Sequence, residues 1–253
     1  MQNSWAVVTG ASSGLGVTFA EKVASEGVNV VLAARTAGPM EELAARLQEQ
    51  HGVETLVMPV DLSDREARGA LIERLHGMDI SYLINNAGFA TIGDFAEADP
   101  TRMLQEKELN MVALTQLARA VTPGMISRGR GAIINVASTA AFQPIPTMAV
   151  YAATKAYVLR LTIALWEELF HTGVRAIAIC PGPTDTPFFA EAGDDTKMAK
   201  RRTPAQVVET TFAGLGRHQP YVVDGAANAL MAFATRLAPV KLQAALARWV
   251  ATR

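Results

Sequence analysis

The segment Ala6-Val7-Val8-Thr9-Gly10-Ala11-Ser12-Ser13-Gly14-Leu15-Gly16 begins with a short apolar run and ends among three closely spaced glycines. Its first four residues are typical of a buried strand, and residues 17–26 have the pattern of a helix. A glycine-rich turn between a strand and a helix lets the backbone approach a pyrophosphate, which the N–H groups of the helix N-terminus can bind. The spacing Gly10-x-x-x-Gly14-x-Gly16 differs from the usual dinucleotide-binding pattern, so a simple tight turn is the alternative interpretation.

The alternation of strand and helix continues through the rest of the chain. Short apolar runs predict strands at residues 28–33, 55–60, 80–84, 132–136, 176–179 and 221–223, and helical patterns cover residues 40–50, 100–121 and 151–170. Such alternation is typical of a parallel sheet that is covered by helices on both faces. No linker, repeat or low-complexity tract divides the chain, so we expect a single α/β domain over residues 1–253.

The composition indicates a globular protein without a strong electrostatic field. The 253 residues are 50% hydrophobic and 19% charged, with a formal net charge of −1, so we expect no nucleic-acid partner. The single cysteine, Cys180, excludes an internal disulfide framework and fits a reducing compartment. Because the N-terminus lacks a signal-peptide pattern and no run of about 18 apolar residues occurs, we expect a cytoplasmic protein.

The second predicted strand bears on the choice of nucleotide. Sites for NAD commonly place an acid near the end of this strand, where it accepts hydrogen bonds from the adenosine ribose. Here the strand ends Leu32-Ala33-Ala34-Arg35-Thr36, and Arg35 suits a 2′-phosphate because its planar guanidinium makes bidentate contacts. NADP(H) is therefore the preferred cofactor and NAD(H) the second choice. A solvated surface arginine is the alternative interpretation of Arg35.

Tyr151 and Lys155 stand four residues apart in a predicted helix, so their side chains share one face. A positive charge beside a tyrosine stabilises the phenolate, which would lower its pKa from about 10 and allow proton transfer nearer neutral pH. Ser138 follows the strand pattern of residues 132–136, at the edge of the sheet where catalytic residues gather. Taken alone, the pair is better explained as an amphipathic surface pair, and Ser138 as a turn or cap residue.

Further motifs follow in a characteristic order. They are residues 9–16, Asp61-Leu62, Asn85-Asn86-Ala87-Gly88, Asn110, Ser138, Tyr151 with Lys155, and Pro181-Gly182. Their order and intervals resemble those of the short-chain dehydrogenase/reductase family across nearly the whole chain. The resemblance implies a single-domain Rossmann-like fold, with a doubly wound parallel sheet of about seven strands and helices on both faces.

The resemblance also implies a role for individual positions. Tyr151 would exchange a proton with the substrate oxygen, Ser138 would hydrogen-bond that oxygen, and Lys155 would lower the pKa of Tyr151 and bind the nicotinamide ribose. Asn110 completes this catalytic tetrad, and would hold a water that links Lys155 to solvent. The cofactor would contact Gly10, Ser12, Ser13, Gly14, Leu15, Gly16, Arg35, Asp61, Leu62, Asn86, Ala87, Gly88, Tyr151, Lys155, Pro181, Gly182, Thr184 and Thr186.

Apolar residues flank the catalytic motifs and favour a hydrophobic carbonyl or alcohol substrate, although at least half of them are expected to pack in the core. They are Phe89, Phe142, Pro144, Ile145, Pro146, Met148, Phe188 and Phe189. Residues 183–204 lack periodicity, and the resemblance to the family implies that this region closes over the substrate as a lid. The basic end of the lid, Lys197, Lys200, Arg201 and Arg202, faces either solvent or an anionic substrate. The four histidines have no metal-ligand spacing, so we expect no metal.

Residues 226–253 form a tail that many members of the family lack, and which resembles the longer ends of a branch of general reductases. The tail contains Arg236, Lys241, Arg248 and Arg253 among apolar residues, and no acid. Three interpretations remain, ranked in this order: a helix packed on its own domain, an oligomer interface, and a basic amphipathic surface that touches a membrane. A homodimer is preferred over the tetramer that other members of the family form.

The sequence therefore predicts an NADP-dependent oxidoreductase. It would reduce a hydrophobic ketone or aldehyde, or oxidise the matching secondary alcohol, with Tyr151 as the general acid or base. The alternative is an NADP-binding sensor or scaffold that acts through its C-terminal surface.

Overall fold

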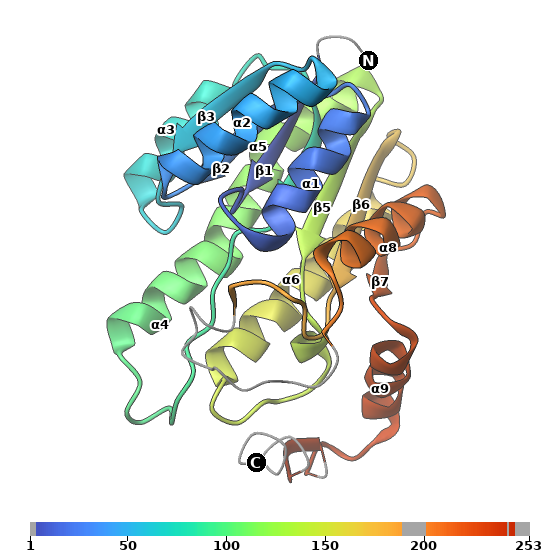
Figure 1. The fold of residues 1–253 in the computed structure, drawn as a ribbon. Coiled ribbons are helices and arrows are strands. Elements are labelled where there is room, and N and C mark those ends of the chain that lie inside the picture. The colour runs from blue at the N-terminus through green and yellow to red at the C-terminus, as the bar shows by residue number, and fades with distance from the viewer. Residues whose placement is uncertain (1–3, 189–200, 242, 246–253) are drawn as a thin grey trace.

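The computed structural model describes residues 4–188, 201–241 and 243–245. Seven strands form one sheet in the order β3-β2-β1-β4-β5-β6-β7, and every neighbouring pair is parallel (Figure 1). The strands are β1 (Trp5–Thr9), β2 (Asn29–Ala34), β3 (Thr55–Pro59), β4 (Ile80–Asn85), β5 (Gly131–Val136), β6 (Val174–Cys180) and β7 (Tyr221–Val223). The predicted doubly wound parallel sheet is confirmed.

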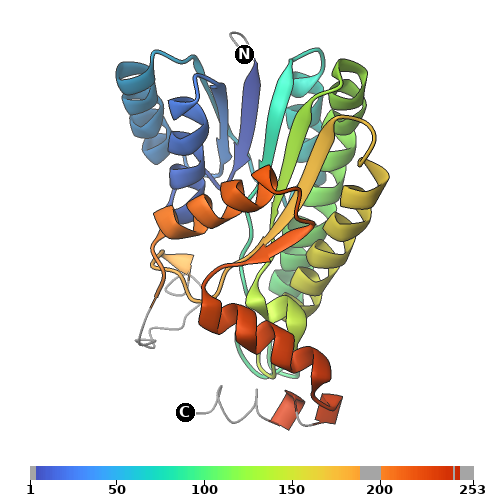
Figure 2. The same cartoon turned by 90° about the vertical axis from the view of Figure 1, so that its right-hand side faces the viewer.

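Helices cover both faces of this sheet (Figures 1 and 2). The α-helices are α1 (Gly14–Ser25), α2 (Ala37–His51), α3 (Arg65–Leu75), α4 (Pro100–Lys107), α5 (Leu114–Arg128), α6 (Ala149–Glu168), α8 (Pro204–Gly216) and α9 (Ala226–Leu237), with a π-helical segment η1 (Glu108–Ala113) and a 3₁₀ turn η2 (Thr139–Phe142). Helices α1, α2 and α8 pack on one face, while α3 and α5 pack on the other. Helix α9 lies at the end of the molecule toward which the strands point.

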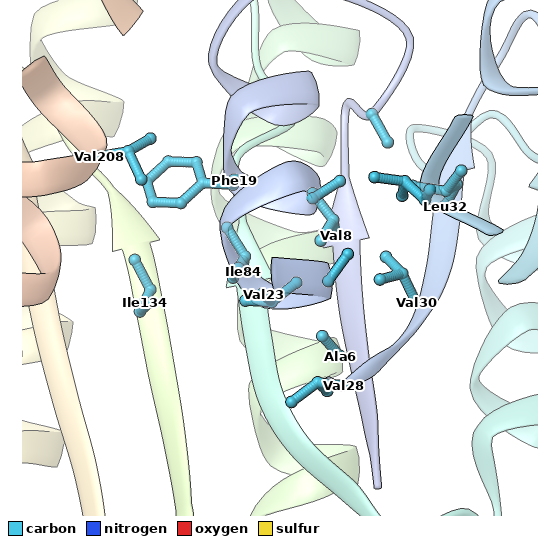
Figure 3. Packing of buried hydrophobic residues seen from close by; sticks show 14 of the residues in the cluster. Ala6, Val8, Phe19, Val23, Val28, Val30, Leu32, Ile84, Ile134 and Val208 are labelled. Carbon is cyan, nitrogen blue, oxygen red and sulfur yellow. The ribbon is translucent and has the colours of Figure 1, made fainter. Parts of the chain in front are cut away.

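The core beneath α1 fixes the position of the first turn. Phe19 and Val23 are fully buried against alternate residues of the strands, including Val8 and Val30 (Figure 3). The ring of Phe19 also lies 6.5 Å from that of Phe212 on α8. Burial of a side chain of this size contributes about 1.5–3 kcal/mol. Helix α1, whose N-terminus follows the glycine-rich turn, is therefore held in place by close packing against the sheet and α8.

Two helices were not predicted, although their N-terminal caps are visible in the sequence. Helix α3 begins after Asp64, whose carboxylate accepts a hydrogen bond from Ala67 N. Helix α8 begins with Pro204 and has a capping box in which Thr203 and Gln206 bond each other's backbone N–H groups. The helical pattern predicted over residues 100–121 is confirmed as α4, η1 and α5, and the helical structure continues to Arg128.

Most of the predicted lid, residues 189–200, lies outside the described residues. At its two ends Thr184 and Arg202 form an isolated parallel bridge, which brings the start and end of the segment together.

Within the described ranges, no helix combines the length and apolar character that crossing a membrane requires.

Candidate active site

A cavity of about 1440 Å³ lies at the carboxyl ends of the strands. Pockets for small molecules usually measure about 300–1000 Å³, so this one has room for more than one such molecule. Segments that follow all seven strands line it together. The predicted site residues on its wall are Gly10, Ser12, Ser13, Gly14, Leu15, Arg35, Asp61, Leu62, Asn86, Ala87, Gly88, Ser138, Tyr151, Lys155, Pro181, Gly182, Thr184 and Thr186. Gly16 and Asn110 are buried behind this wall.

The turn after β1 requires glycine for two physical reasons. Gly10 and Gly14 have φ angles of 66° and 54°, a left-handed conformation that side chains disfavour. At Gly16 a Cβ atom would stand 2.1 Å from the carbonyl oxygen of Gly10. The chain therefore folds tightly over the N-terminus of α1, where Ser13 is the N-cap residue and its side chain forms no capping hydrogen bond. Backbone N–H groups at such a terminus suit an anionic ligand.

The segment after β4 holds this turn in place. Asn86 Nδ2 donates hydrogen bonds to Thr9 O (2.9 Å) and Gly10 O (3.2 Å). In return, Thr9 Oγ1 accepts hydrogen bonds from the backbone N–H groups of Asn86 and Ala87. Deeper in the sheet, Asn85 Nδ2 donates to Asn135 Oδ1 at 2.9 Å and so links β4 to β5. The ends of the central strands are thereby fixed relative to one another.

Arg35 follows β2 directly, is exposed and lines the cavity. The carboxylate of Asp61, after β3, accepts hydrogen bonds from the backbone and hydroxyl of Ser63. Leu62 is buried, and its carbonyl accepts a hydrogen bond from Arg68 Nη1 at 2.7 Å. This end of the cavity thus combines the exposed guanidinium of Arg35 with a wall, formed by Asp61 and Leu62, that is held by hydrogen bonds and is partly apolar.

Tyr151 and Lys155 lie one turn apart on α6, and both side chains are buried. Lys155 Nζ donates a hydrogen bond to Val136 O at 2.8 Å and lies 5.6 Å from the centre of the Tyr151 ring. Ser138 is the N-cap of η2, and its Oγ accepts a hydrogen bond from Ala140 N. The end of β5 and the start of α6 therefore place a serine, a tyrosine and a lysine at one point of the cavity wall.

Burial dominates the ionisation of this pair. It raises the pKa of Tyr151 to about 12, although a hydrogen bond with Ser138 opposes the rise and the charge of Glu106 adds to it. Burial also lowers the pKa of Lys155 to about 8. Desolvation is the largest influence on the pKa of Tyr151, and the Lys155 ammonium is directed at Val136 O. The lowering of the Tyr151 pKa by Lys155 stays a prediction.

Asn110 lies within the π-helical segment η1, a rare conformation that is common at functional sites. Its Oδ1 accepts a hydrogen bond from Phe89 N, while its Nδ2 donates to Phe89 O and Thr154 Oγ1. A Cβ atom on Gly88 would lie 2.9 Å from Asn110 Oδ1 and 3.5 Å from Lys155 Nζ. Asn110 therefore connects the segment after β4 with helix α6, directly behind Lys155.

The family model for short chain dehydrogenases matches residues 4–197 of the chain. The chain belongs to this family. A short-chain dehydrogenase from Sphingobium yanoikuyae, solved in complex with NADPH, is 36% identical and superimposes with a TM-score of 0.83 over 87% of each chain. A bulky-bulky ketone specific alcohol dehydrogenase from Comamonas testosteroni is 31% identical, with a TM-score of 0.81 over 94% of this chain and 93% of its own.

A curated relative of a different length is the very-long-chain 3-oxoacyl-CoA reductase of Rattus norvegicus. It is 32% identical over 205 residues, which make up 79% of this chain. The match covers 62% of the rat protein, so this member of the short-chain dehydrogenase family spans about three fifths of that relative.

Several residues of the cavity were missed by the sequence interpretation. Helix α9 and the turn after it contribute Met231, Ala234, Thr235, Ala238 and Gln243 to the wall. Helix α9 is held close because Asn228 packs on Gly182, where a Cβ atom would lie 2.4 Å from Asn228 Nδ2. No local pattern indicates this contact. Arg102 on α4 also lines the cavity, and Glu106 on the same helix is fully buried. Their periodic spacing before Asn110 is the signal that was available.

The predicted apolar lining divides between the cavity and the core. Phe89, Ile145, Met148 and Phe188 line the cavity, whereas Phe142 packs against Tyr221 with ring centres 6.0 Å apart. Pro144 and Pro146 are not among the lining residues, and Phe189 lies outside the described residues. Cys180 is fully buried in the core, as its place in an apolar run predicts.

The basic end of the predicted lid is only partly described. Arg202 forms two hydrogen bonds, of 2.8 and 2.9 Å, with the buried carboxylate of Asp224. Its guanidinium is therefore paired with a carboxylate of the protein, although 35% of the side chain remains exposed to solvent. Lys197 and Lys200 lie outside the described residues. Among those that are described, no three His, Cys, Asp or Glu side chains form a group that could hold a metal ion.

Proposed function

We propose that the protein is an NADP(H)-dependent oxidoreductase that interconverts a bulky, apolar ketone or aldehyde and the corresponding alcohol. One observation carries the proposal: Ser138, Tyr151 and Lys155 lie on the wall of the same cavity as the glycine-rich turn. A proton donor and a dinucleotide site must face a common carbonyl for this reaction, and the parallel sheet places both at one edge.

The residues present fit NADP(H). The turn at Gly10, Gly14 and Gly16 leaves no room for side chains, so the backbone can approach a pyrophosphate at the N-terminus of α1. Arg35 stands where the 2′-phosphate is recognised in folds of this type, and Pro181 to Thr186 would hold the nicotinamide end. When bound, the cofactor supplies or accepts the hydride. The complex of the Sphingobium relative with NADPH supports this choice over NAD(H).

The side chains of α6 and η2 would handle the proton. In reduction, Tyr151 donates its phenolic proton to the substrate oxygen as negative charge develops there. Ser138 donates a hydrogen bond to the same oxygen, as in an oxyanion hole. Lys155 would bind the nicotinamide ribose, whose hydroxyls offer it acceptors in addition to Val136 O. A cation held beside the phenolate stabilises it, so we expect the pKa of Tyr151 to fall below about 12 in the complex.

The shape and lining of the cavity support a large apolar substrate. Ile145, Met148 and Phe188 pack against the cluster that contains Tyr151. Phe89 and Met231 of α9 extend the apolar wall. Pockets with mostly apolar walls and a few polar groups bind ligands of the same character. The Comamonas enzyme acts on ketones with two bulky substituents and the rat enzyme on a very-long-chain 3-oxoacyl thioester. Both names describe long or bulky carbonyl substrates.

The decisive experiment follows NADPH consumption with a panel of bulky ketones, with NADH in parallel. We expect the Tyr151→Phe variant to lose about 10²–10⁴-fold in kcat while it still binds NADPH. The matched control is Tyr157→Phe, one helical turn and a half further along α6, where the phenol hydroxyl bonds Thr115 Oγ1 at 2.8 Å instead. If the wild type binds NADPH but reduces no carbonyl and Tyr151→Phe changes nothing, the protein is a sensor or scaffold.

We also propose a cytoplasmic homodimer, with α9 at the interface. The single cysteine, Cys180, is buried, which suits a reducing compartment. Leu230, Phe233 and Leu237 recur on one face of α9 and are 60–74% exposed, which makes them the natural contact between two copies. A basic membrane-touching surface remains the third interpretation of the tail.

A further inference from the structure

Three polar residues stand one helical turn apart along α4 and η1: Arg102, Glu106 and Asn110. Side chains at this spacing share one helix face. Only Asn110 belongs to the motif series on which the proposed function rests. Glu106 is completely buried, which is exceptional for an acid that has no ion pair within the described residues.

All three side chains hold the backbone of residues 89–91, the segment that follows Gly88. Arg102 Nη2 donates to Ala90 O at 3.3 Å, and the guanidinium lies 4.7 Å from the centre of the Phe89 ring. Glu106 Oε2 accepts a hydrogen bond from Thr91 N at 3.0 Å. Asn110 bonds both backbone groups of Phe89. Residues 89–91 are thereby clamped beside the catalytic pair, with Phe89 on the cavity wall.

The second carboxylate oxygen, Glu106 Oε1, is buried and forms no hydrogen bond in the described structure. Burial raises the pKa of Glu106, whereas its bonds with Thr91 and the charges of Arg102 and Lys155 lower it. The charged groups that face Glu106 are therefore Arg102 on its own helix and Lys155 on α6, with Tyr151 as the titratable neighbour. Glu108 points elsewhere, since it pairs with Arg68.

We propose that Glu106 is a positioning residue of the reaction, which holds residues 89–91 on the cavity wall and places a buried negative charge beside Tyr151 and Lys155. This inference rests on the proposed function for its kinetic consequences. The negative charge opposes ionisation of the phenol and favours the ammonium. The carboxylate therefore raises the pKa of Tyr151 and, after the larger influence of Cys180, that of Lys155. Glu106 thus keeps Tyr151 a proton donor and Lys155 a cation over a wider range of pH.

Two substitutions separate position from charge. Glu106→Gln keeps an oxygen for Thr91 N but removes the charge, so the Tyr151-dependent limb of the pH–rate profile moves to lower pH, by about half a unit or more, for reduction and for alcohol oxidation alike. Glu106→Asp keeps the charge, but its shorter side chain moves the carboxylate oxygen away from Thr91 N. We therefore expect kcat to fall several-fold while the pH dependence stays close to that of the wild type. Glu97→Gln, the loss of an exposed acid shortly before α4, is the control and leaves both unchanged.

A second readout does not depend on turnover. In lysine labelled with ¹³C, nuclear magnetic resonance follows the titration of Lys155, and the signal is assigned by its absence in Lys155→Met. We expect a midpoint near pH 8, which Glu106→Gln moves lower and Glu97→Gln leaves in place. If the wild type reduces no carbonyl compound, the proposed function is overturned, but the effect of Glu106 on the Lys155 titration is not. An unshifted Lys155 titration in folded Glu106→Gln, with NADPH affinity retained, overturns the role of Glu106. If Glu106→Gln does not fold, a wild-type kcat in Glu106→Asp overturns it.

Discussion

Lys155 is buried with only 5% of its surface exposed, and its ammonium donates to the carbonyl of Val136. Because burial disfavours the charged form, folding lowers the pKa of Lys155 from 10.5 to about 8. The folded protein therefore contains a charged group whose desolvation opposes folding at neutral pH. Such destabilisation is a common property of residues that are placed for function rather than for stability.

The thermodynamic consequence of Lys155 can be measured. Between about pH 8 and 10.5 the unfolded chain binds more protons at Lys155 than the folded one, so the stability contributed by this residue rises with pH across that window. At pH 7 we expect the free energy of unfolding of Lys155→Met to exceed that of the wild type by about 1–2 kcal/mol, after allowance for the lost hydrogen bond. Urea unfolding at pH 7 and pH 9.5 tests this: the advantage must shrink at the higher pH.

Arg35 is the residue on which the choice between the two dinucleotides depends. It is exposed on the cavity wall directly after β2, a position where sites for NAD place an acid. A charge-assisted contact contributes about 1.5–3 kcal/mol, so Arg35→Gln should weaken NADPH binding about 10- to 100-fold and leave NADH binding unchanged. Fluorescence titration of both cofactors measures this. Arg119→Gln, on the exposed side of α5, serves as the control, and equal losses for NADPH and NADH would contradict the role of Arg35.

At the scale of secondary structure, the sequence predicts the part of the site that is formed by residues at the carboxyl ends of the strands. All seven strands are parallel, so the residues that follow them reach one edge of the sheet, and motifs distant in sequence converge without knowledge of the packing. The contribution of α4 and α9 could not be predicted in this way. Glu106 acts through tertiary contacts with Thr91, and Asn228 reaches Gly182 only because α9 folds back over β7.

Local chemistry explains the elements that the sequence interpretation missed. In α3 the buried face includes Arg68, whose charge interrupts the apolar periodicity and is satisfied by Glu108, Gln116 and Leu62 O. In α8 the capping box at Thr203 and Gln206 lies in the part of the chain that lacks periodicity, where only a search for caps would have found it. Caps thus locate helices that apolar spacing does not.

The contact between α9 and the segment after β6 makes a sharp prediction about one glycine. Gly182→Ala inserts a Cβ atom at 2.4 Å from Asn228 Nδ2, and overpacking of this kind costs about 1–3 kcal/mol. We expect a lower melting temperature and weaker substrate binding, because α9 must move away from the cavity. The double variant Gly182→Ala with Asn228→Ala should recover part of the loss. Purely additive effects of the two substitutions on the unfolding free energy would show that they do not touch.

At the scale of the whole molecule, charge and apolar surface are unevenly distributed. All 24 acidic residues occur by residue 224, while Arg236, Lys241, Arg248 and Arg253 follow without an acid. The exposed apolar stripe of Leu230, Phe233 and Leu237 lies on the same terminal region, with Val240 just beyond it. Helix α9 therefore presents an apolar face to solvent and a second face to the cavity, where Met231 and Thr235 line the wall.

This arrangement predicts a dimer whose assembly and catalysis are separable. Exposed apolar patches on a globular protein commonly mark contacts with a partner, and a second copy of α9 offers a matching stripe about a twofold axis. We expect the wild type to sediment as a dimer and the triple variant Leu230→Ser, Phe233→Ser, Leu237→Ser to sediment as a monomer. Because none of the three substituted side chains lines the cavity, NADPH affinity should stay within about threefold of the wild type.

The control for this experiment is Phe95→Ser, which removes an equally exposed aromatic residue from the loop that precedes α4. Its sedimentation should match that of the wild type, because an isolated apolar side chain on a loop is ordinary for a protein surface. A wild type that sediments as a monomer at high concentration would exclude the dimer. Binding of that monomer to anionic lipid vesicles, lost in the triple variant but not in Phe95→Ser, would then identify the apolar stripe of α9 as a membrane-touching surface.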